Sequence, residues 1–139
     1  MKIGDIKFKA KRLDNGEWII GNLIRSTAGV KERAYIVDNF SSMSDCSIVG
    51  VDPSTVCQFT GLKDCEGKEV WDHDLLQSQG SGVIYEVSWS QREGCFIVKE
   101  SVSGARLFSF LCAALTLYKF KVIGNKFDKN KLAYVTRIY

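Results

Sequence analysis

The segment that decides the fold reads VDPSTVCQFTGLKDCEGKEVWDHDLL and covers residues 51–76. Pro53, the single proline of the chain, predicts a turn after a short strand. Gly61 and Gly67 predict a second tight turn, because glycine accepts the positive φ angles that such turns need. The polar residues 72–74 form a corner before the next strand. A chain that turns this often is typical of short antiparallel strands.

The flanking segments predict two β-hairpins. Residues 6–11 alternate apolar and lysine side chains, which is the two-residue period of a half-buried strand. Residues 17–24 return after an Asp-Asn-Gly turn. Residues 83–89 and 94–99 form the second hairpin. Residues 105–115 are the one predicted helix, because their leucine, phenylalanine and alanine side chains recur at helical spacing.

These elements together predict a mostly β protein. We expect short antiparallel strands in barrel-like units, one short helix near residues 105–115, and further strands at 117–123 and 132–138. The alternation of strands and helices that builds a Rossmann sheet is missing from the pattern, so that fold is not expected. The sequence shows no internal repeat.

The composition is that of an ordinary globular chain. Its 139 residues are 45% hydrophobic and 25% charged, which excludes a disordered tail, a collagen-like repeat and a coiled coil. A net charge of only +3 gives no general electrostatic case for nucleic acid. Residues 118–139 nevertheless carry six basic side chains against the single acidic Asp128.

Targeting signals and cysteine usage predict a compartment. The N-terminus has no signal-peptide pattern, and the longest nearly apolar stretch, residues 107–117, is shorter than the roughly 18 residues that cross a bilayer. We therefore expect a cytoplasmic protein with no membrane partner. The five cysteines, an odd number without a Cys-x-x-Cys pair, argue against a disulfide framework and a zinc ribbon.

Residues 51–76 resemble the central motif of the YopX family, small proteins found mainly in bacteriophages, prophages and mobile elements. Further stretches resemble the same family at residues 8–12, 15–24 and 121–128. The sequence departs from the family pattern at Cys57, where the family tends to have glycine, and at Asp72-His73, where it tends to have Glu-Gly. The final residues, 131–139, are more strand-like than the family pattern.

The resemblance implies an all-β fold of small barrel-like units and an origin in a phage or mobile element, so the cytoplasm would be that of a host cell. Asp74-Leu75-Leu76 also resembles the entry to a strand of an SH3-like barrel. The family is of unknown function, so the resemblance implies no catalytic residue, and we expect no cofactor. We expect a single YopX-like domain over residues 1–139, with an N-terminal β lobe (1–60) and a barrel-like lobe (61–139) as the alternative.

Two interpretations of the central motif stay open. In the structural one, its glycines and Asp64 make turns while Phe59 and Leu62 point inward. In the functional one, polar side chains of the motif line a pocket for a small anionic ligand. With two lysines of the C-terminal strands, the predicted ligand-binding residues are Gln58, Thr60, Lys63, Lys119 and Lys121.

His73, the sole histidine, lies between Asp72 and Asp74. Three consecutive side chains rarely face one metal, because alternate side chains of an extended segment point apart, so we expect no metal site there. No nucleophile stands at a recognisable spacing, and we expect no catalytic residue. Cys57 and Cys65 are likewise expected to be non-catalytic.

Three functions follow as hypotheses. The first is a non-enzymatic accessory protein whose β-scaffold binds a partner or a small anionic ligand, for instance to sequester a nucleotide signal in counter-defence. The second is a nucleic-acid-binding factor that uses the lysines and aromatic residues of the basic C-terminal strands, although such lysines also protect strand edges. The third is a metal-dependent enzyme centred on His73. The many aromatic residues also predict a homo-oligomer.

Overall fold

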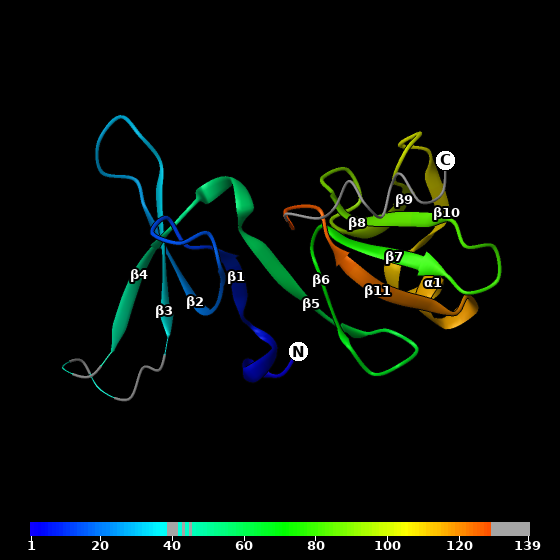
Figure 1. Cartoon of the computed structure of the whole chain (residues 1–139), viewed down its shortest axis with the longest axis horizontal. Helices are drawn as coiled ribbons and strands as arrows, with labels where there is room; N and C mark the ends of the chain where they lie inside the picture. The colour runs from blue at the N-terminus through cyan, green and yellow to red at the C-terminus, as the bar shows by residue number, and fades with distance from the viewer. Residues whose placement is uncertain (39–41, 43, 45, 129–139) are drawn as a thin grey trace. The chain divides into compact units, whose positions relative to one another are not determined.

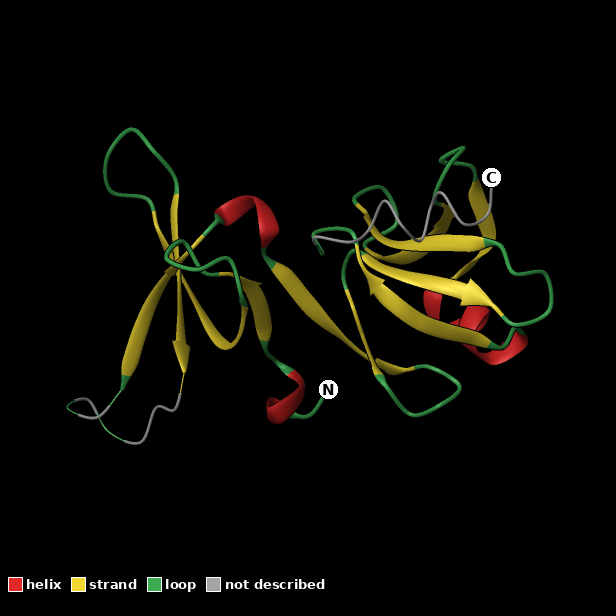
Figure 2. Cartoon of the chain, viewed as in Figure 1, coloured by secondary structure: helices red, strands yellow, loops and turns green. Residues whose placement is uncertain are grey.

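The structure is a computed structural model that describes residues 1–38, 42, 44 and 46–128. Its internal contacts divide the chain into two compact units, Met1–Phe59 and Thr60–Tyr139. Antiparallel strands dominate both units, and α1 (Leu111–Leu117) is the one α-helix among the described residues (Figure 2). The prediction of a mostly β protein with one short helix is confirmed.

The first unit is built mainly of antiparallel strands (Figure 1). Its elements are η1 (Ile3–Asp5), β1 (Phe8–Lys11), β2 (Trp18–Ser26), β3 (Arg33–Asp38), β4 (Ser47–Val51), the 3₁₀ turn η2 (Pro53–Thr55) and β5 (Cys57–Lys63). β5 continues into the second unit, and the hydrogen-bonded order is β4-β3-β2-β1-β5-β6. The two-residue period predicted for the first hairpin is present: Ala10 is fully buried opposite Ile19, in a core with Ile36.

The second unit contains the remaining elements. They are β6 (Glu69–Trp71), β7 (Asp74–Ser78), β8 (Ile84–Ser90), β9 (Cys95–Glu100), β10 (Arg106–Phe110), α1 and β11 (Phe120–Asn125). The larger sheet of this unit has the order β10-β9-β8-β7-β11. α1 buries Leu111 and Ala114 against the core of that sheet, which includes Leu76, Val98 and Phe120.

The two units share one topology, which the sequence does not reveal. In each, four antiparallel strands follow one another, a short helical turn comes next, and a fifth strand pairs with the first. The orders β4-β3-β2-β1-β5 and β10-β9-β8-β7-β11 are therefore equivalent. The repeat lies in strand connectivity rather than in recurring residues, so a search for sequence self-similarity finds nothing.

The position of the helix corrects the prediction for residues 105–115. Arg106 and Phe110 pair with Lys99 and Ile97 of β9, so this stretch is the strand β10 and the helix begins only at Leu111. The apolar spacing of residues 106–110 is compatible with a helix and with a strand. A strand forms because its pairing with β9 satisfies the backbone hydrogen-bonding groups of both strands. The predicted strand at 132–138 lies outside the described residues.

Of the predicted barrel-like units, the structure confirms the antiparallel sheets. The strand order of each sheet ends at an outer strand on both sides, so no closed barrel forms among the residues that the structure describes. An isolated bridge between Arg12 and Val51 does bring the end of β4 to the end of β1.

Candidate functional site

Asp64 of the central motif has a structural role. Its Oδ1 accepts hydrogen bonds from the backbone N–H groups of Glu66 and Lys68, both at 2.9 Å, and its Oδ2 accepts one from Val122 N–H at 2.9 Å. Burial alone would raise the pKa of Asp64, but these three donors outweigh it and lower the pKa below its ordinary value. The carboxylate thus ties the β5–β6 turn to β11.

Asp74 has a similar role at the turn between β6 and β7. Its Oδ2 accepts a hydrogen bond from Trp71 N–H at 2.7 Å, and its Oδ1 accepts one from the side-chain amide of Asn125 at 2.9 Å. The same amide donates to the carbonyl oxygen of Asp72 at 3.1 Å. Asp74 and Asn125 are each 2% exposed, so this network holds the end of β11 and leaves no open carboxylate for a ligand.

The motif residues predicted to bind a ligand, Gln58, Thr60 and Lys63, lie along β5. The Thr60 hydroxyl donates to Val70 O at 2.6 Å and accepts from Leu62 N–H at 3.2 Å, which satisfies it within the β5–β6 pair. Gln58 is half-buried opposite Phe8 of β1, and Lys63 is exposed. Gly61 and Gly67 have φ angles of +82° and +83°, as the structural interpretation of the motif requires.

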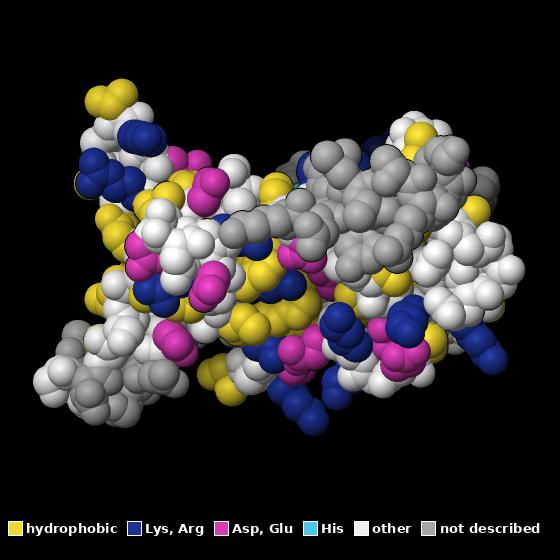
Figure 3. All heavy atoms as spheres, viewed as in Figure 1, with side chains coloured by type: hydrophobic (Ala, Val, Ile, Leu, Met, Phe, Trp, Pro, Cys, Tyr) yellow, Lys and Arg dark blue, Asp and Glu magenta, His cyan; other side chains and the backbone are white. Residues whose placement is uncertain are grey.

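The predicted lysines of the C-terminal strands, Lys119 and Lys121, are both exposed. Lys119 has its side chain in solvent, and Lys121 Nζ lies 3.3 Å from Glu66 Oε1. The turn that follows Lys63 therefore reaches β11, since Cys65 N–H also donates to Phe120 O at 3.2 Å. On the face that Figure 3 shows, basic and acidic side chains alternate rather than form one continuous basic patch.

His73 is placed between two carboxylates. Its Nε2 lies 3.4 Å from Asp72 Oδ2, and its Nδ1 lies 3.7 Å from Glu86 Oε2. Its ring packs edge-on with that of Phe127, with the ring centroids 5.2 Å apart. Its φ of +65° is unique among the non-glycine residues that the structure describes, which explains why glycine suits this position in the family pattern. In the described ranges, no group of three His, Cys, Asp or Glu side chains could hold a metal ion.

The carboxylates beside His73 have opposite pKa shifts. Burial raises the pKa of Asp72, against the opposing pull of the neighbouring imidazole. Burial would also raise the pKa of Glu86, but His73 and Lys126 outweigh it and lower that pKa. At neutral pH the ionised Glu86 carboxylate therefore stabilises the folded state, whereas ionisation of Asp72 opposes folding.

A hollow in the first unit is a concave site that the sequence does not reveal. Its volume is about 430 Å³. The lining residues are Leu13, Lys31, Glu32, Arg33, Ala34, Tyr35, Gly50, Val51, Asp52 and Pro53. They come from the β1–β2 turn, the start of β3, and the end of β4 with η2. The turn and β4 are joined by the Leu13 N–H bond to Gly50 O at 3.1 Å and the Asp52 N–H bond to Lys11 O at 2.9 Å.

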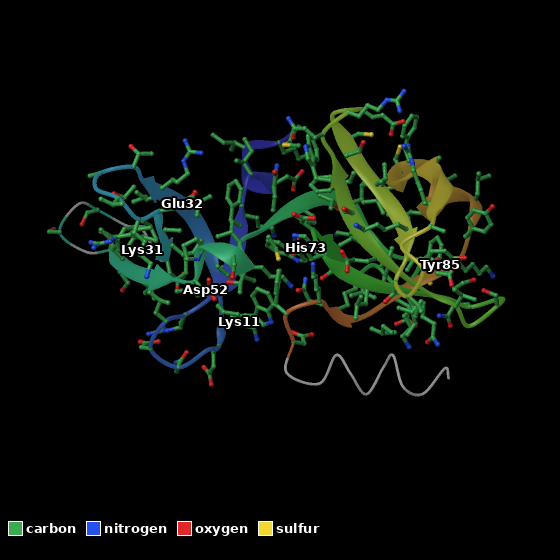
Figure 4. All side chains as sticks on the ribbon, turned by 90° about the horizontal axis from the view of Figure 1, so that it is seen from above. Lys11, Lys31, Glu32, Asp52, His73 and Tyr85 are labelled. Carbon is green, nitrogen blue, oxygen red and sulfur yellow. The ribbon has the colours of Figure 1, made fainter. Side chains whose placement is uncertain are left out.

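The charged side chains of the hollow are available for a ligand. Lys31, Glu32 and Arg33 are exposed, and none of them forms an ion pair or a side-chain hydrogen bond within the part of the chain that the structure describes. Asp52 already uses its Oδ1 to accept from Ser54 N–H and Oγ–H at 3.0 and 2.8 Å. Figure 4 shows Lys31, Glu32 and Asp52 on the same unit. The charged run at 31–33 and a glycine inside a strand were the available sequence signals.

The fold and the site define a small, mostly β protein with a hollow in its first unit. The model of the YopX protein family matches residues 7–133, so the chain belongs to the YopX family. No curated protein matches the chain. None of the helices in the described residues has the length and apolarity to cross a membrane.

Proposed function

We propose that this YopX family protein is a non-enzymatic accessory protein of a phage or mobile element, acting in the cytoplasm of the host cell, whose β-scaffold binds a small anionic ligand. The observation that carries the proposal is the hollow of the first unit, where the exposed cations Lys31 and Arg33 stand at an apolar floor. Lys31 and Arg33 can attract the anionic part of a ligand, although Glu32 and Asp52, which also line the hollow, balance their charge. A volume of about 430 Å³ lies in the usual range of ligand sites, about 300–1,000 Å³. Sequestering a nucleotide signal is the role that this chemistry favours.

Thermal unfolding of the full chain with pyrophosphate as the probe tests the proposal. At a concentration of about 100 Kd, binding to the folded state adds about 2.7 kcal/mol and raises Tm by several degrees. We expect the rise to be lost in the double variant Lys31→Gln/Arg33→Gln. It should persist in Lys63→Gln/Lys119→Gln, which removes two cations predicted from the sequence. Loss in the second variant instead would place the site at the β5–β6 turn, and no rise in the unmodified protein would contradict anion binding.

A nucleic-acid-binding role is the second candidate, favoured by the exposed side chains before and in β11. Lys119 and Lys121 are exposed next to Tyr118, which is 46% exposed, a combination that suits neutralisation of phosphates with base stacking. A gel-shift titration with single-stranded DNA at low salt should then give a complex that Lys119→Gln/Lys121→Gln weakens. The absence of any complex at low salt would eliminate this role.

We also propose that the first unit is a barrel-like, partly SH3-like unit. The support is that β1 pairs with β2 and β5 while its end meets Val51 of β4 through the Arg12 bridge. Amide hydrogen exchange tests this: the N–H groups of Leu13 and Asp52, which bond across that seam, should be as protected as those within β2 and β3. Rapid exchange at both would show that the seam is open.

Self-association is proposed for the outer face of β2 and β4. Ile20, Ile24 and Ile48 are 48%, 44% and 59% exposed, and the strand registers put them on the same face of the sheet. Apolar side chains gathered on one face are commonly covered by a partner chain. Sedimentation should show a dimer that Ile24→Lys dissociates, and a concentration-independent monomer would contradict the proposal.

A further inference from the structure

Gly50 in β4 is a glycine that the protein's own structure does not require. Its φ is not among the positive values, and it lies opposite Tyr35 in a regular antiparallel ladder. A Cβ added at this position would meet only Leu13 Cδ1 within 4 Å, at an ordinary contact distance of 3.6 Å. Glycine inside a strand weakens it, and one common reason for its presence is the close approach of a ligand.

The surroundings of Gly50 form a binding surface for a planar ring. Gly50 and Tyr35 both line the hollow, with Leu13 and Pro53 at its other sides. Because Gly50 presents only backbone at the floor, a planar ring can lie close to the strand and against the aromatic side chain of Tyr35. Aromatic contacts of this kind favour a ring over an aliphatic group of equal size.

The charges of the hollow call for a ligand that carries both an anion and hydrogen-bond donors. Lys31 and Arg33 supply positive charge, and arginine binds phosphate through two parallel hydrogen bonds. Glu32 is exposed between them in sequence and can only accept hydrogen bonds when ionised. An inorganic anion would satisfy the cations and be repelled by Glu32, whereas sugar hydroxyls or a ring amino group would pair with that carboxylate.

We propose that the hollow binds a nucleoside phosphate, with the base over Gly50 against Tyr35, the phosphate at Lys31 and Arg33, and donor groups of the ligand on Glu32. Gly50 and Tyr35 then determine specificity, because they select for the ring, while the two cations select for the charge. This inference rests on the proposed function, whose anion-binding claim it narrows to one ligand class.

Isothermal titration of the full chain with three kinds of probe distinguishes binding of an anion from recognition of the base. The probes are inorganic phosphate, the four common nucleosides, and their 5′-monophosphates. We expect at least one monophosphate to bind ten times more tightly than inorganic phosphate. Gly50→Val, which fills the space over the strand without a φ conflict, should remove that advantage.

Two further variants keep the test decisive. Gly80→Val is the matched control, because Gly80 also lacks a positive φ and has open space around its Cβ position, and it lies in the other unit. Tyr35→Ala replaces Gly50→Val if the latter does not fold. Equal affinities for phosphate and monophosphates, unchanged in Gly50→Val or Tyr35→Ala, would contradict the proposal that the base binds over Gly50. The proposal of anion binding would then still stand. Failure of every probe to bind would overturn both.

Discussion

Gly21 in β2 is a position where one added methyl group should strongly destabilise the first unit. An alanine Cβ would lie 2.2 Å from the carbonyl oxygen of Val37 and 3.0 Å from Ile36 Cγ2. Real Cβ atoms essentially never come within 3.0 Å of another heavy atom, so β3 would have to retreat by the difference of about 0.8 Å. Asn22 and Val37 are register partners, so the retreat would disturb the β2–β3 ladder next to the substitution.

We expect Gly21→Ala to lower the free energy of unfolding by about 3 kcal/mol, the upper end of the range for over-packed sites, because the clash is with backbone that cannot rotate away. Domains typically have about 5–15 kcal/mol in total, so the loss is large. Urea denaturation of the full chain measures it. Hydrogen exchange read by mass spectrometry should assign the loss to peptides of residues 1–38 and not to those of residues 60–128.

Gly50→Ala is the matched control. It is the same substitution in another strand of the same sheet, but its Cβ meets only Leu13 at 3.6 Å. Its stability should be unchanged or raised by about 0.5–1 kcal/mol, since alanine loses less chain entropy on folding than glycine. Equal stability of the two variants, or a Gly21→Ala protein as stable as the unmodified one, would refute the reasoning.

One buried and two half-buried carboxylates give further predictions. Asp64→Asn should lower the free energy of unfolding by about 2 kcal/mol at neutral pH in urea denaturation, because one amide oxygen replaces a carboxylate that accepts three backbone donors. The pKa of Asp64 is lower in the folded than in the unfolded state, so its carboxylate stabilises the fold fully above the unfolded-state pKa. This stabilisation is lost as the pH falls through the folded-state pKa. The difference in the free energy of unfolding between Asp64→Asn and the unmodified protein should therefore shrink in acid. Glu86→Gln should lower Tm at pH 7, and this difference should also fade on acidification, because the pKa of Glu86 is lowered. Asp72→Asn should have the opposite sign: the raised pKa means that the ionised carboxylate opposes folding above that pKa, so Tm at pH 7 should equal or exceed that of the unmodified protein, and a clear fall would contradict this.

Local patterns predicted the first hairpin and the turns of the central motif well. The lysine alternation of residues 6–11 became β1, and Gly67 has the positive φ that its turn needs, whereas Gly61, predicted for the same turn, has its positive φ inside strand β5. These features depend on neighbours in the chain, so they are visible in the sequence. The extent of the helix was wrong because residues 106–110 pair with β9, and the local pattern of residues 105–115 does not show which segment lies beside them.

The hollow could not be predicted because its lining comes from segments far apart in the sequence. Leu13, Tyr35 and Gly50 meet through the β3–β4 register and the bridge between Arg12 and Val51. The predicted roles of Gln58, Lys63, Lys119 and Lys121 stay predictions. That of Thr60 must compete with the hydrogen bond that its hydroxyl makes to Val70.

The central claim is that the family motif builds turns while the hollow binds the ligand. An NMR titration of backbone amides with the nucleoside 5′-monophosphates tests it most directly, because it reports where binding occurs. We expect saturable shifts concentrated at Lys31–Tyr35 and Gly50–Asp52. Shifts concentrated at Lys63, Lys119 and Lys121, or no saturable shift anywhere, would contradict the claim.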